Sequence, residues 1–430
     1  MNGPFLVRHT FIMRSVFIGL LMLGIISGTM ERSLAASAEA AYAQAPTLTL
    51  AEKVLALAAE VRRLGGSGVS APLSDADVED IIAGSVVWLL RAQEENGHFR
   101  YEYAPYEDRY LGGDNIVRQA GTFYQLGEAL QRKKGNIEAI AVAMERSAGY
   151  FEELSRQGIH DGMEFTCVVE DAESTRCKLG ATALVLVGMI GLAEHDDTYR
   201  AEYDDRIASY AAFLEVMQKD NGGFRNIFDF ESSTQSDAES SYSNGEAFLA
   251  LVRYHQYRLD ETTKERIDET FRYLKDEVPF DVPLYLWVMA AVDDLYRAGL
   301  RAEYEAYVKS YTDWRIAGFV DRLETDHNMC AYTEGIALGY GMLKRFLPVT
   351  ARAPYREEVS FWLAKGSELQ VGEDDRYHVT FARGVPSFSM IADTERALGG
   401  FLTGTSALTE RIDFTQHCLN SYLVWDAIGH

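Results

Sequence analysis

The stretch that decides the fold runs from Ser240 to Tyr254 and reads SSYSNGEAFLALVRY. A polar segment turns there into a helix that is apolar on nearly every side, which is typical of a buried helix. Asn244 can cap the first free backbone N–H groups, and Glu246 lies in the first turn, where a carboxylate is favoured. The same succession of a polar or small opening and an apolar helix occurs six times in the chain.

Helices of this kind alternate with amphipathic helices along most of the chain. The apolar helices are expected at residues 115–131, 179–194, 244–257, 283–298, 330–346 and 413–428. The amphipathic helices are expected at residues 75–93, 137–157, 203–219, 262–276, 302–319 and 355–369. A helix that is apolar all round must be covered on every side, so the alternation predicts two concentric rings with the apolar helices inside. The fold class is therefore all-α, a double ring of six helical hairpins with short extended segments in its loops.

Two glycine turns of the chain share one pattern. They read Gln93-x-x-Asn96-Gly97-x-Phe99 and Gln218-x-x-Asn221-Gly222-Gly223-Phe224. Both resemble the repeat motif of the terpenoid cyclase superfamily, in which Gln and an aromatic residue bracket a glycine turn. Residues 70–430 thus resemble the six-hairpin (α/α)6 toroids, which include terpenoid cyclases, protein prenyltransferases, lanthionine cyclases, sugar 2-epimerases, glucuronyl epimerases, glycoside hydrolases and polysaccharide lyases. The resemblance implies this fold without assigning a specific family.

The resemblance does not extend to terpene chemistry. The sequence lacks the Asp-x-Asp-Asp motif that protonates the substrate in triterpene cyclases, and Asp204-Asp205 and Asp293-Asp294 lack the second acidic partner of a diphosphate–magnesium site. Only fragments of the lanthionine cyclase zinc set are present. One zinc site remains open, because its ligand types suit a borderline-soft metal. Its members are His327, Cys330, Asp413 and His417. No other cofactor is expected.

The N-terminus has the pattern of a secretory signal peptide over residues 1–38. Arg8, His9 and Arg14 precede an apolar run at residues 16–26, which is short for a bilayer span, and Ala36-Ser37-Ala38 suits a cleavage site. An uncleaved N-terminal anchor is the alternative. Residues 39–70 are expected to hold a leader and a first helix at 48–64, and residues 71–430 the toroid domain. We therefore expect the protein in the periplasm or outside the cell.

Charge and cysteine content agree with such a compartment. The formal net charge of −24 disfavours nucleic acid and anionic membrane surfaces as partners, and no membrane contact is expected beyond the signal peptide. Cys167 and Cys177 flank a polar segment, and an oxidising compartment would let them form a disulfide. Cys330 and Cys418 lie near the heads of apolar helices, where a free cysteine usually behaves as a small hydrophobe. The oligomeric state stays open.

The inner helices of such a ring all point the same way, so their N-terminal ends meet at one mouth of the central cavity. Helix N-termini offer partial positive charge and free N–H groups, which favour anions and hydroxyl-rich ligands. The candidate catalytic residues at these ends are Glu246, Glu334, Asp114 and His417. The candidate substrate-binding residues are Arg118, Gln119, Arg176, Tyr242, Asn244, Tyr285, Tyr332, Asp413 and Gln416. Helix capping alone can explain why Asp and Asn stand at these positions, and the arginines can serve only as counterions of the carboxylates. A functional site is favoured because so many polar groups meet at one mouth.

Two reaction schemes suit these residues, and the sequence does not choose between them. Hydrolysis of a glycoside needs two carboxyl groups across the cleaved bond, which Glu246 and Glu334 can supply, with Asp114 as the third candidate. Epimerisation or elimination of a uronic acid needs a His or Tyr base and an arginine that neutralises the carboxylate. These roles are open to His417, Tyr332, Arg118 and Arg176.

The favoured function is that of a secreted or periplasmic carbohydrate-active enzyme, of the glycoside hydrolase, lyase or epimerase type, acting on an envelope or exported polysaccharide. Acid/base catalysis by Glu246 and Glu334 is expected, with Asp413 orienting His417 on the same helical face. A non-catalytic glycan-binding or envelope-assembly protein is the alternative, and a zinc-dependent cyclase-like enzyme is the third reading. The expected partner is a carbohydrate or another hydroxyl-rich small molecule.

Overall fold

The structure is a computed structural model, and it describes residues 72–299, 302–320, 329–372, 377–382, 385–390, 394–404 and 408–429. The predicted signal peptide, leader and first helix lie outside these residues. The chain divides into two units, residues 1–69 and 70–430, and the second is described here. Within the described ranges no helix has the length and apolar character needed to cross a membrane.

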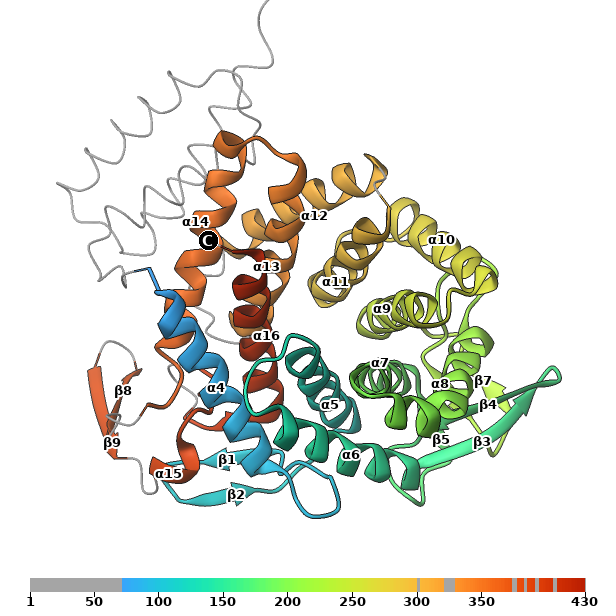
Figure 1. Ribbon diagram of the computed structural model, residues 1–430, viewed down its shortest axis with the longest axis horizontal. Coiled ribbons are helices and arrows are strands. Elements are labelled where there is room, and N and C mark those ends of the chain that lie inside the picture. Colours follow the sequence, from blue (N-terminus) through green and yellow to red (C-terminus); the bar gives the residue numbers. More distant parts are fainter. Residues whose placement is uncertain are drawn as a thin grey trace, which may run out of the picture. The chain divides into compact units, whose positions relative to one another are not determined.

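Six helices form the closed inner ring of this unit (Figure 1). They are α5 (Ile116–Gln131), α7 (Leu179–His195), α9 (Ser241–Arg258), α11 (Val282–Ala298), α13 (Met329–Phe346) and α16 (Ile412–Ile428). Each packs against the next, and α16 packs against α5, which closes the ring. Helix α7 is buried on all sides from Leu179 to Ala193, as its uniformly apolar sequence predicts. Its backbone approaches α5 closely, because a Cβ on Gly191 would lie 3.2 Å from the Cα of Gly127.

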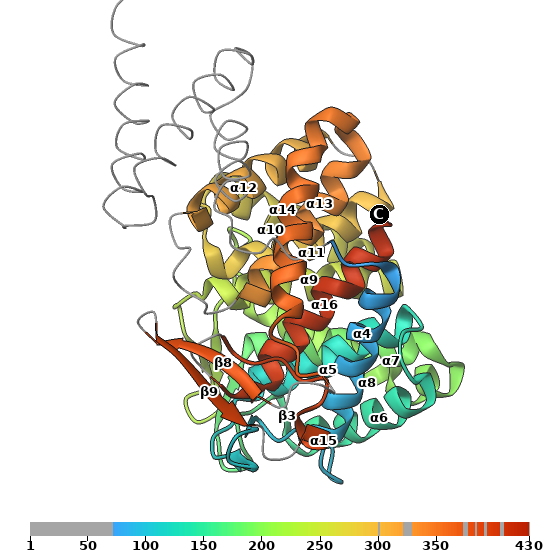
Figure 2. The same ribbon diagram turned by 90° about the vertical axis from the view of Figure 1, so that its left-hand side faces the viewer.

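Six further helices cover the inner ring from outside. They are α4 (Asp75–Ala92), α6 (Ile137–Glu153), α8 (Asp197–Met217), α10 (Glu261–Asp276), α12 (Ala302–Val320) and α14 (Val349–Ser367). Each packs on one or two inner helices, and Figure 2 shows inner α16 between outer α4 and α14. Helix α10 buries Ile267, Phe271 and Leu274, which recur every three or four residues on one face. The amphipathic helices therefore form the outer ring, as expected.

The described residues also include a short helix, α15 (Thr394–Ala397), and ten short strands. One sheet has the order β10–β1–β2, formed by β10 (Glu410–Arg411), β1 (Glu102–Ala104) and β2 (Arg109–Leu111). A second has the order β5–β6–β7, formed by β5 (Arg176–Lys178), β6 (Ile227–Asp229) and β7 (Thr234–Gln235). Two hairpins pair β3 (Ser155–His160) with β4 (Met163–Val168) and β8 (Tyr377–Ala382) with β9 (Val385–Met390). Strands β5 and β10 run directly into inner helices, so the two sheets lie at the N-terminal ends of the inner ring.

The glycine turns join neighbouring outer helices. The side-chain amide of Gln93 donates to the backbone of α6, that of Gln218 to α10, and that of Gln370 to α4. Each glutamine also forms a β-bridge with a phenylalanine beyond the turn. The turns contain three glycines with φ of 90°, 92° and 90°, a conformation that favours glycine. They are Gly97, Gly222 and Gly399. Among the described residues the motif occurs three times, and its third copy was not recognised from the sequence.

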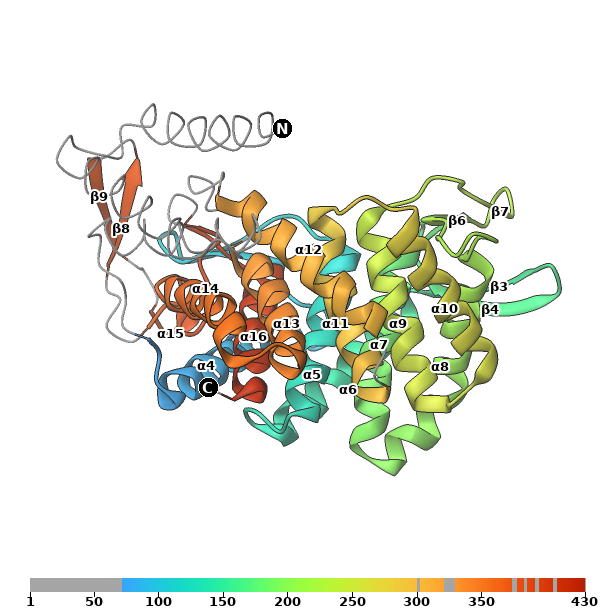
Figure 3. The ribbon, with the colours of Figure 1, turned by 90° about the horizontal axis from the view of Figure 1, so that it is seen from above.

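Four predicted helix boundaries were wrong by three residues or more. The helix expected from residue 203 begins at Asp197, because the Asp196 side chain caps it, and the helix expected from residue 355 begins at Val349. The helix expected from Asn244 begins at Ser241, because Ser240 is the N-cap and its hydroxyl accepts from the Ser243 N–H. The helix expected to reach residue 157 ends at Glu153, because residues 155–168 form the β3–β4 hairpin, which extends away from the helices in Figure 3. Asp161-Gly162 at its tip has φ of 49° and 82°, a signature of a tight hairpin turn.

Both cysteine pairs form disulfides. Cys167 and Cys177 are joined, which is the pairing expected from the sequence. Cys330 and Cys418 are joined as well, so the expectation of two free cysteines was wrong. The pairing is possible because α13 and α16 are neighbours in the inner ring and bring the two Cα atoms to 4.6 Å, within the range of a disulfide.

Candidate functional site

The candidate site lies in one layer of the inner ring, close to the N-terminal ends of its helices. Glu246, Glu334 and His417 are each the sixth residue of their helices, which begin at residues 241, 329 and 412. Trp287 is the sixth residue of α11, which begins at residue 282. In the ring order α5–α7–α9–α11–α13–α16, helices α9 and α16 are three places apart. Glu246 and His417 therefore belong to opposite helices of the ring at the same depth.

His417 is held by a carboxylate from the neighbouring helix. Its Nδ1 lies 2.6 Å from Oε2 of Glu334. Asn420, one turn further along α16, donates through Nδ2 to the other oxygen of Glu334 at 2.7 Å. Glu334 is 1% exposed, whereas the His417 side chain is 12% exposed. A carboxylate on Nδ1 fixes the ring orientation and the tautomer, so Nε2 is the nitrogen free to accept a proton.

Glu246 is a buried carboxyl group without a hydrogen-bond partner among the described residues. It is 1% exposed, and its Oε1 is enclosed with no donor in reach. Burial raises the pKa of Glu246 from its ordinary 4.5 to about 7, although the Arg118 guanidinium acts in the opposite direction. Its Oε2 packs against the start of α7, where a Cβ on Gly180 would collide with it. A carboxyl group with this pKa can both donate and accept a proton near neutral pH.

Trp287 belongs to the same layer and Asn420 lies one helical turn from it; both were missed by sequence reasoning. The Trp287 ring lies 6.2 Å from the His417 ring and 6.1 Å from the Tyr124 ring, measured between centroids. Trp287 Nε1 and Asn420 Oδ1 are buried without a hydrogen bond to the described chain, as is Glu246 Oε1. Buried polar groups are normally paired, so three unpaired atoms around one layer fit a place where a ligand completes the bonding. An aromatic near a helix head was the only signal that could have indicated Trp287.

Gln119 and Asn244 were expected to bind substrate, and the structure gives them a different role. The side-chain oxygen of Gln119 accepts the Phe99 N–H at 2.9 Å, and that of Asn244 accepts the Phe224 N–H at 3.0 Å. Thr415 does the same for the third glycine turn, since its hydroxyl accepts from the Phe401 N–H. All three are the fourth residues of their inner helices. These side chains fasten the turns to the inner ring.

Tyr285 and Tyr332 were also expected at the cavity mouth, but their hydroxyls face the outer ring. Tyr285 donates to Thr312 Oγ1 on α12 at 3.0 Å, and Tyr332 donates to Glu358 Oε1 on α14 at 2.9 Å. Both residues are 1% exposed. The inner helices are apolar on all sides, so the sequence carried no information about which side of each helix faces the axis. Neither tyrosine is placed to touch a ligand in the layer.

The remaining expected residues lie around the layer and not within it. Asp114 is exposed and contacts His98 Nε2 at 3.2 Å, so it is not part of the cluster around Glu334. Gln416 is buried and accepts from the Thr122 hydroxyl on α5 at 2.9 Å. Tyr242 is 41% exposed at the start of α9, and Arg176 is exposed on β5.

Asp413 does not orient His417, contrary to expectation. Its carboxylate lies between two arginines: Arg411 forms a bidentate pair with it at 3.0 and 2.5 Å, and Arg118 Nε lies 3.1 Å from Oδ2. Glu334 takes the orienting role instead. Of the two arginines, Arg118 also acts on Glu246, where its positive charge opposes the rise of the pKa that burial causes.

The zinc set predicted from the sequence does not assemble. Cys330 is bonded to Cys418 and offers no thiolate, and Asp413 is paired with arginines. His327 lies outside the described residues. Across the described ranges, no group of three or more His, Cys, Asp or Glu side chains is arranged to hold a metal ion.

Comparison with known proteins gives matches through structure alone. No protein-family model matches the sequence, and no curated protein matches it. A cellobiose 2-epimerase from Bacillus thermoamylovorans is similar with a TM-score of 0.57 and 12% identity, over 81% of this chain and 99% of that one. The chain is an (α/α)6 toroid. A sugar epimerase from a ruminal bacterium (TM-score 0.56, 9% identity, 81% and 98% covered) and a family 76 α-mannanase from Bacteroides thetaiotaomicron (0.54, 11%, 81% and 94%) have the same fold. At these identities the similarity shows the fold of the toroid and nothing finer.

Proposed function

We propose that the protein is a carbohydrate-active enzyme that transfers a proton on a sugar, as a sugar epimerase or isomerase does, with His417 as the base. The observation that carries this proposal is the Glu334 carboxylate 2.6 Å from Nδ1 of His417, because it leaves Nε2 free in the layer of the candidate site. The names of three similar structures agree with it: a sugar epimerase, a cellobiose 2-epimerase and a D-mannose isomerase.

The chemistry follows from two groups on opposite helices. Nε2 of His417 takes the proton from the carbon next to the carbonyl of an open-chain sugar, and the electron pair moves onto the carbonyl oxygen as an enediolate forms. Glu246, whose pKa is about 7, donates its proton to the same carbon from the opposite inner helix as the carbonyl re-forms. Solvent then takes the proton from His417 and restores the one on Glu246. Glu334 and Asn420 stay fixed and stabilise the imidazolium that forms on His417.

The contacts of Glu334 argue against the hydrolytic scheme. A glycosidase needs two carboxyl groups that face the cleaved bond, one of them as an acid and the other as a base or nucleophile. Both oxygens of Glu334 already accept hydrogen bonds, from His417 and Asn420, and the residue is 1% exposed. We therefore assign Glu334 a positioning role and leave Glu246 as the free carboxyl group.

We further propose an extracytoplasmic location and a saccharide of the envelope or an exported polysaccharide as substrate. Two disulfides support an oxidising compartment. One similar structure, a family 76 α-1,6-mannanase variant, holds an α-1,6-mannotetrose, so a toroid of this kind accommodates an oligosaccharide. A non-catalytic glycan-binding protein is the second candidate, and the observation in its favour is that Glu246 and Glu334 are both 1% exposed.

The test is deuterium exchange into sugars. Wild-type protein is incubated in D2O with a panel of reducing mono- and disaccharides, and deuterium at C2 is followed by NMR. We expect exchange with a substrate sugar, a loss of about 10²- to 10⁴-fold in His417→Gln, and no change in Glu95→Gln, an exposed control. Release of new reducing ends from polysaccharides without exchange would replace the proposal by hydrolysis. Saturable binding of a glycan with neither reaction would replace it by the binding function.

A further inference from the structure

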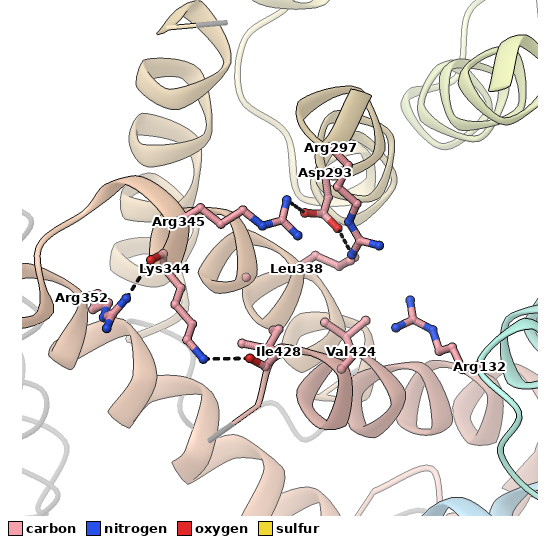
Figure 4. A pocket seen from close by; sticks show the side chains of 11 residues that line it. Arg132, Asp293, Arg297, Leu338, Lys344, Arg345, Arg352, Val424 and Ile428 are labelled. Atoms are coloured by element: carbon pink, nitrogen blue, oxygen red, sulfur yellow. Dashed lines mark hydrogen bonds and ion pairs between the residues drawn. The ribbon is translucent and has the colours of Figure 1, made fainter. Parts of the chain in front are cut away.

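A cavity lies at the C-terminal end of the inner ring (Figure 4). Its volume is about 310 Å³. It is lined by the last turns of α11, α13 and α16, by the C-terminal cap of α5 and by the first turn of α14. Along α16, eleven residues separate His417 from Ile428 in its wall, which corresponds to about 16 Å of helix rise. The cavity is therefore separate from the candidate active site.

The charge of this cavity is opposite to that of the chain. Among the described residues that line it, the charged groups are five basic side chains and one carboxylate, in a protein whose formal net charge is −24. The basic residues are Arg132, Arg297, Lys344, Arg345 and Arg352, and the carboxylate is Asp293. Figure 4 shows their side chains gathered around the hollow from several helices. The apolar part of the wall includes Leu338, Val424 and Ile428.

Among the described residues, the carboxylates near the cavity do not neutralise all of its basic groups. Asp293 is shared by Arg297 at 2.5 Å and Arg345 at 2.8 Å. Arg132 pairs with Glu128, which also pairs with Arg253. Arg253 also pairs with Asp294 of α11, so these two arginines and two carboxylates balance one another. Of the five basic groups that line the cavity, Arg132 is balanced in this way and Asp293 offsets one more, which leaves a surplus of three positive charges.

Lys344 and Arg352 account for most of that surplus. Lys344 Nζ donates to the carbonyl oxygens of Ile428 and Gly429, both at 2.7 Å, and Arg352 Nη1 donates to the carbonyl of Lys344 at 2.7 Å. Neither contacts a carboxylate in the described chain. Burial, together with Arg352 and Arg356 nearby, lowers the pKa of Lys344, which shows that the positive groups repel one another.

Cations at helix C-termini have an ordinary structural explanation, because they offset the partial negative charge of the helix ends. That explanation covers the carbonyl contacts of Lys344 and Arg352. It leaves most of the donors of the four arginines unused, since each guanidinium carries five N–H groups, and Arg132 Nε is buried without a hydrogen bond. It also does not require a hollow of this size, which falls at the lower end of small-molecule sites.

We propose that this cavity binds a small, multiply charged oxyanion of the phosphate type. The forked guanidinium groups of Arg297, Arg345 and Arg352 suit the several acceptor oxygens of such an ion. The apolar wall leaves room for a neutral organic part, so inorganic phosphate and a phosphomonoester are the two sources of this chemistry. The site is independent of the proposed sugar reaction at the other end of the ring.

The test is titration of the full-length protein with inorganic phosphate and with glucose 6-phosphate, followed by calorimetry and by the unfolding midpoint. Sodium chloride at equal ionic strength controls for general salt effects. We expect saturable binding and a higher midpoint with at least one phosphate probe. Tighter binding of glucose 6-phosphate would identify an ester as the ligand class, and equal binding would identify the free ion.

Two substitutions locate the site. Arg352→Gln and Arg297→Gln should each raise the dissociation constant about tenfold or more, because each removes charge-assisted hydrogen bonds. Arg297 is 52% exposed, so its variant folds even if Arg352→Gln does not. Arg206→Gln on α8, which breaks one surface ion pair with Glu152, is the matched control and should bind normally. The proposal is overturned if wild type does not bind either probe, if chloride reproduces the effect, or if Arg297→Gln binds like the control.

Discussion

Replacement of Glu246 by Gln should make the protein more stable at alkaline pH and leave it nearly unchanged at acidic pH. Glu246 is 1% exposed and has no hydrogen-bond donor among the described residues, and burial raises its pKa from 4.5 to about 7. The folded protein therefore binds this proton more tightly than the unfolded chain does. As a result, the free energy of unfolding falls as the pH rises from about 4.5 to about 7, and this contribution is level above that range.

The magnitude follows from the two pKa values. A shift of one pKa unit corresponds to about 1.4 kcal/mol, so a shift from 4.5 to about 7 changes the free energy of unfolding by about 3 kcal/mol in full. About 2.5 kcal/mol of this change develops between pH 5 and pH 8. Glu246→Gln carries no titratable group at this position. Its stability relative to wild type should therefore increase by about 2 to 3 kcal/mol between these two pH values.

Urea unfolding of both proteins at pH 5 and pH 8 measures this double difference. Any constant effect of the amide, such as an unpaired NH2 group, is the same at both pH values and cancels. Glu95→Gln, at an exposed position, controls for the change in net charge and should give a double difference near zero. A double difference for Glu246→Gln that is also near zero, or of the opposite sign, would show that Glu246 is ionised and solvated in the folded protein. Its proposed role as an acid would then have no basis.

Three further predictions concern the frame around the site. Gly180→Ala should lower stability by about 1 to 3 kcal/mol and reduce turnover, because the new methyl group collides with the Glu246 carboxyl. Urea midpoints measure the loss of stability, and the deuterium-exchange assay measures the loss of turnover. Gln119→Ala should lower stability by about 2 kcal/mol without changing the exchange reaction. It removes the hydrogen bonds to the N–H and carbonyl of Phe99 and those to His98 and Asp114, none of which belongs to the layer; an equal loss of exchange would contradict its structural role. Replacing Cys167 and Cys177 together by Ser should lower the free energy of unfolding by about 2 to 3 kcal/mol, as expected for a closed loop of about ten residues. Wild type in reductant should lose more than this, because reductant opens the Cys330–Cys418 disulfide as well; urea midpoints measure both.

The ring could be predicted because its signal is local. The pattern of apolar residues within a stretch of about twenty residues distinguishes a helix that is buried on all sides from one that is buried on a single face. Helices α7 and α10 show the two extremes. The third glycine turn was missed for the opposite reason. Gln370 pairs with Phe401 across an insertion that contains β8 and β9, so the two halves of the motif are far apart in the chain. The β3–β4 hairpin had a local signal, Asp161-Gly162, which helical periodicity before it obscured.

The candidate site was predictable only in part, because the sequence does not show how an inner helix is rotated about its axis. Glu334 and His417 were both expected at the mouth, yet their mutual contact joins residues 83 positions apart. The local alternative, Asp413 four residues before His417, was wrong because arginines occupy that carboxylate. Tyr332 shows the same difficulty: a residue of an apolar helix can face the axis or the outer ring, and packing alone decides which.

One physical property of the fold connects the two proposed sites. Six parallel inner helices align their dipoles, so the N-terminal end of the ring favours carboxylates and the C-terminal end favours cations. Glu246 and Glu334 at one end, and Lys344 and Arg345 at the other, follow this rule. The two ends differ in how far their charges are balanced. In the layer near the N-terminal end, both oxygens of Glu334 accept hydrogen bonds and the pKa of Glu246 lies near neutrality, so the layer itself suits a neutral sugar. At the C-terminal end the described residues keep a surplus of positive charge after their ion pairs are counted. The carbonyl contacts of Lys344 and Arg352 already offset the dipole, so we expect this end to attract an anion.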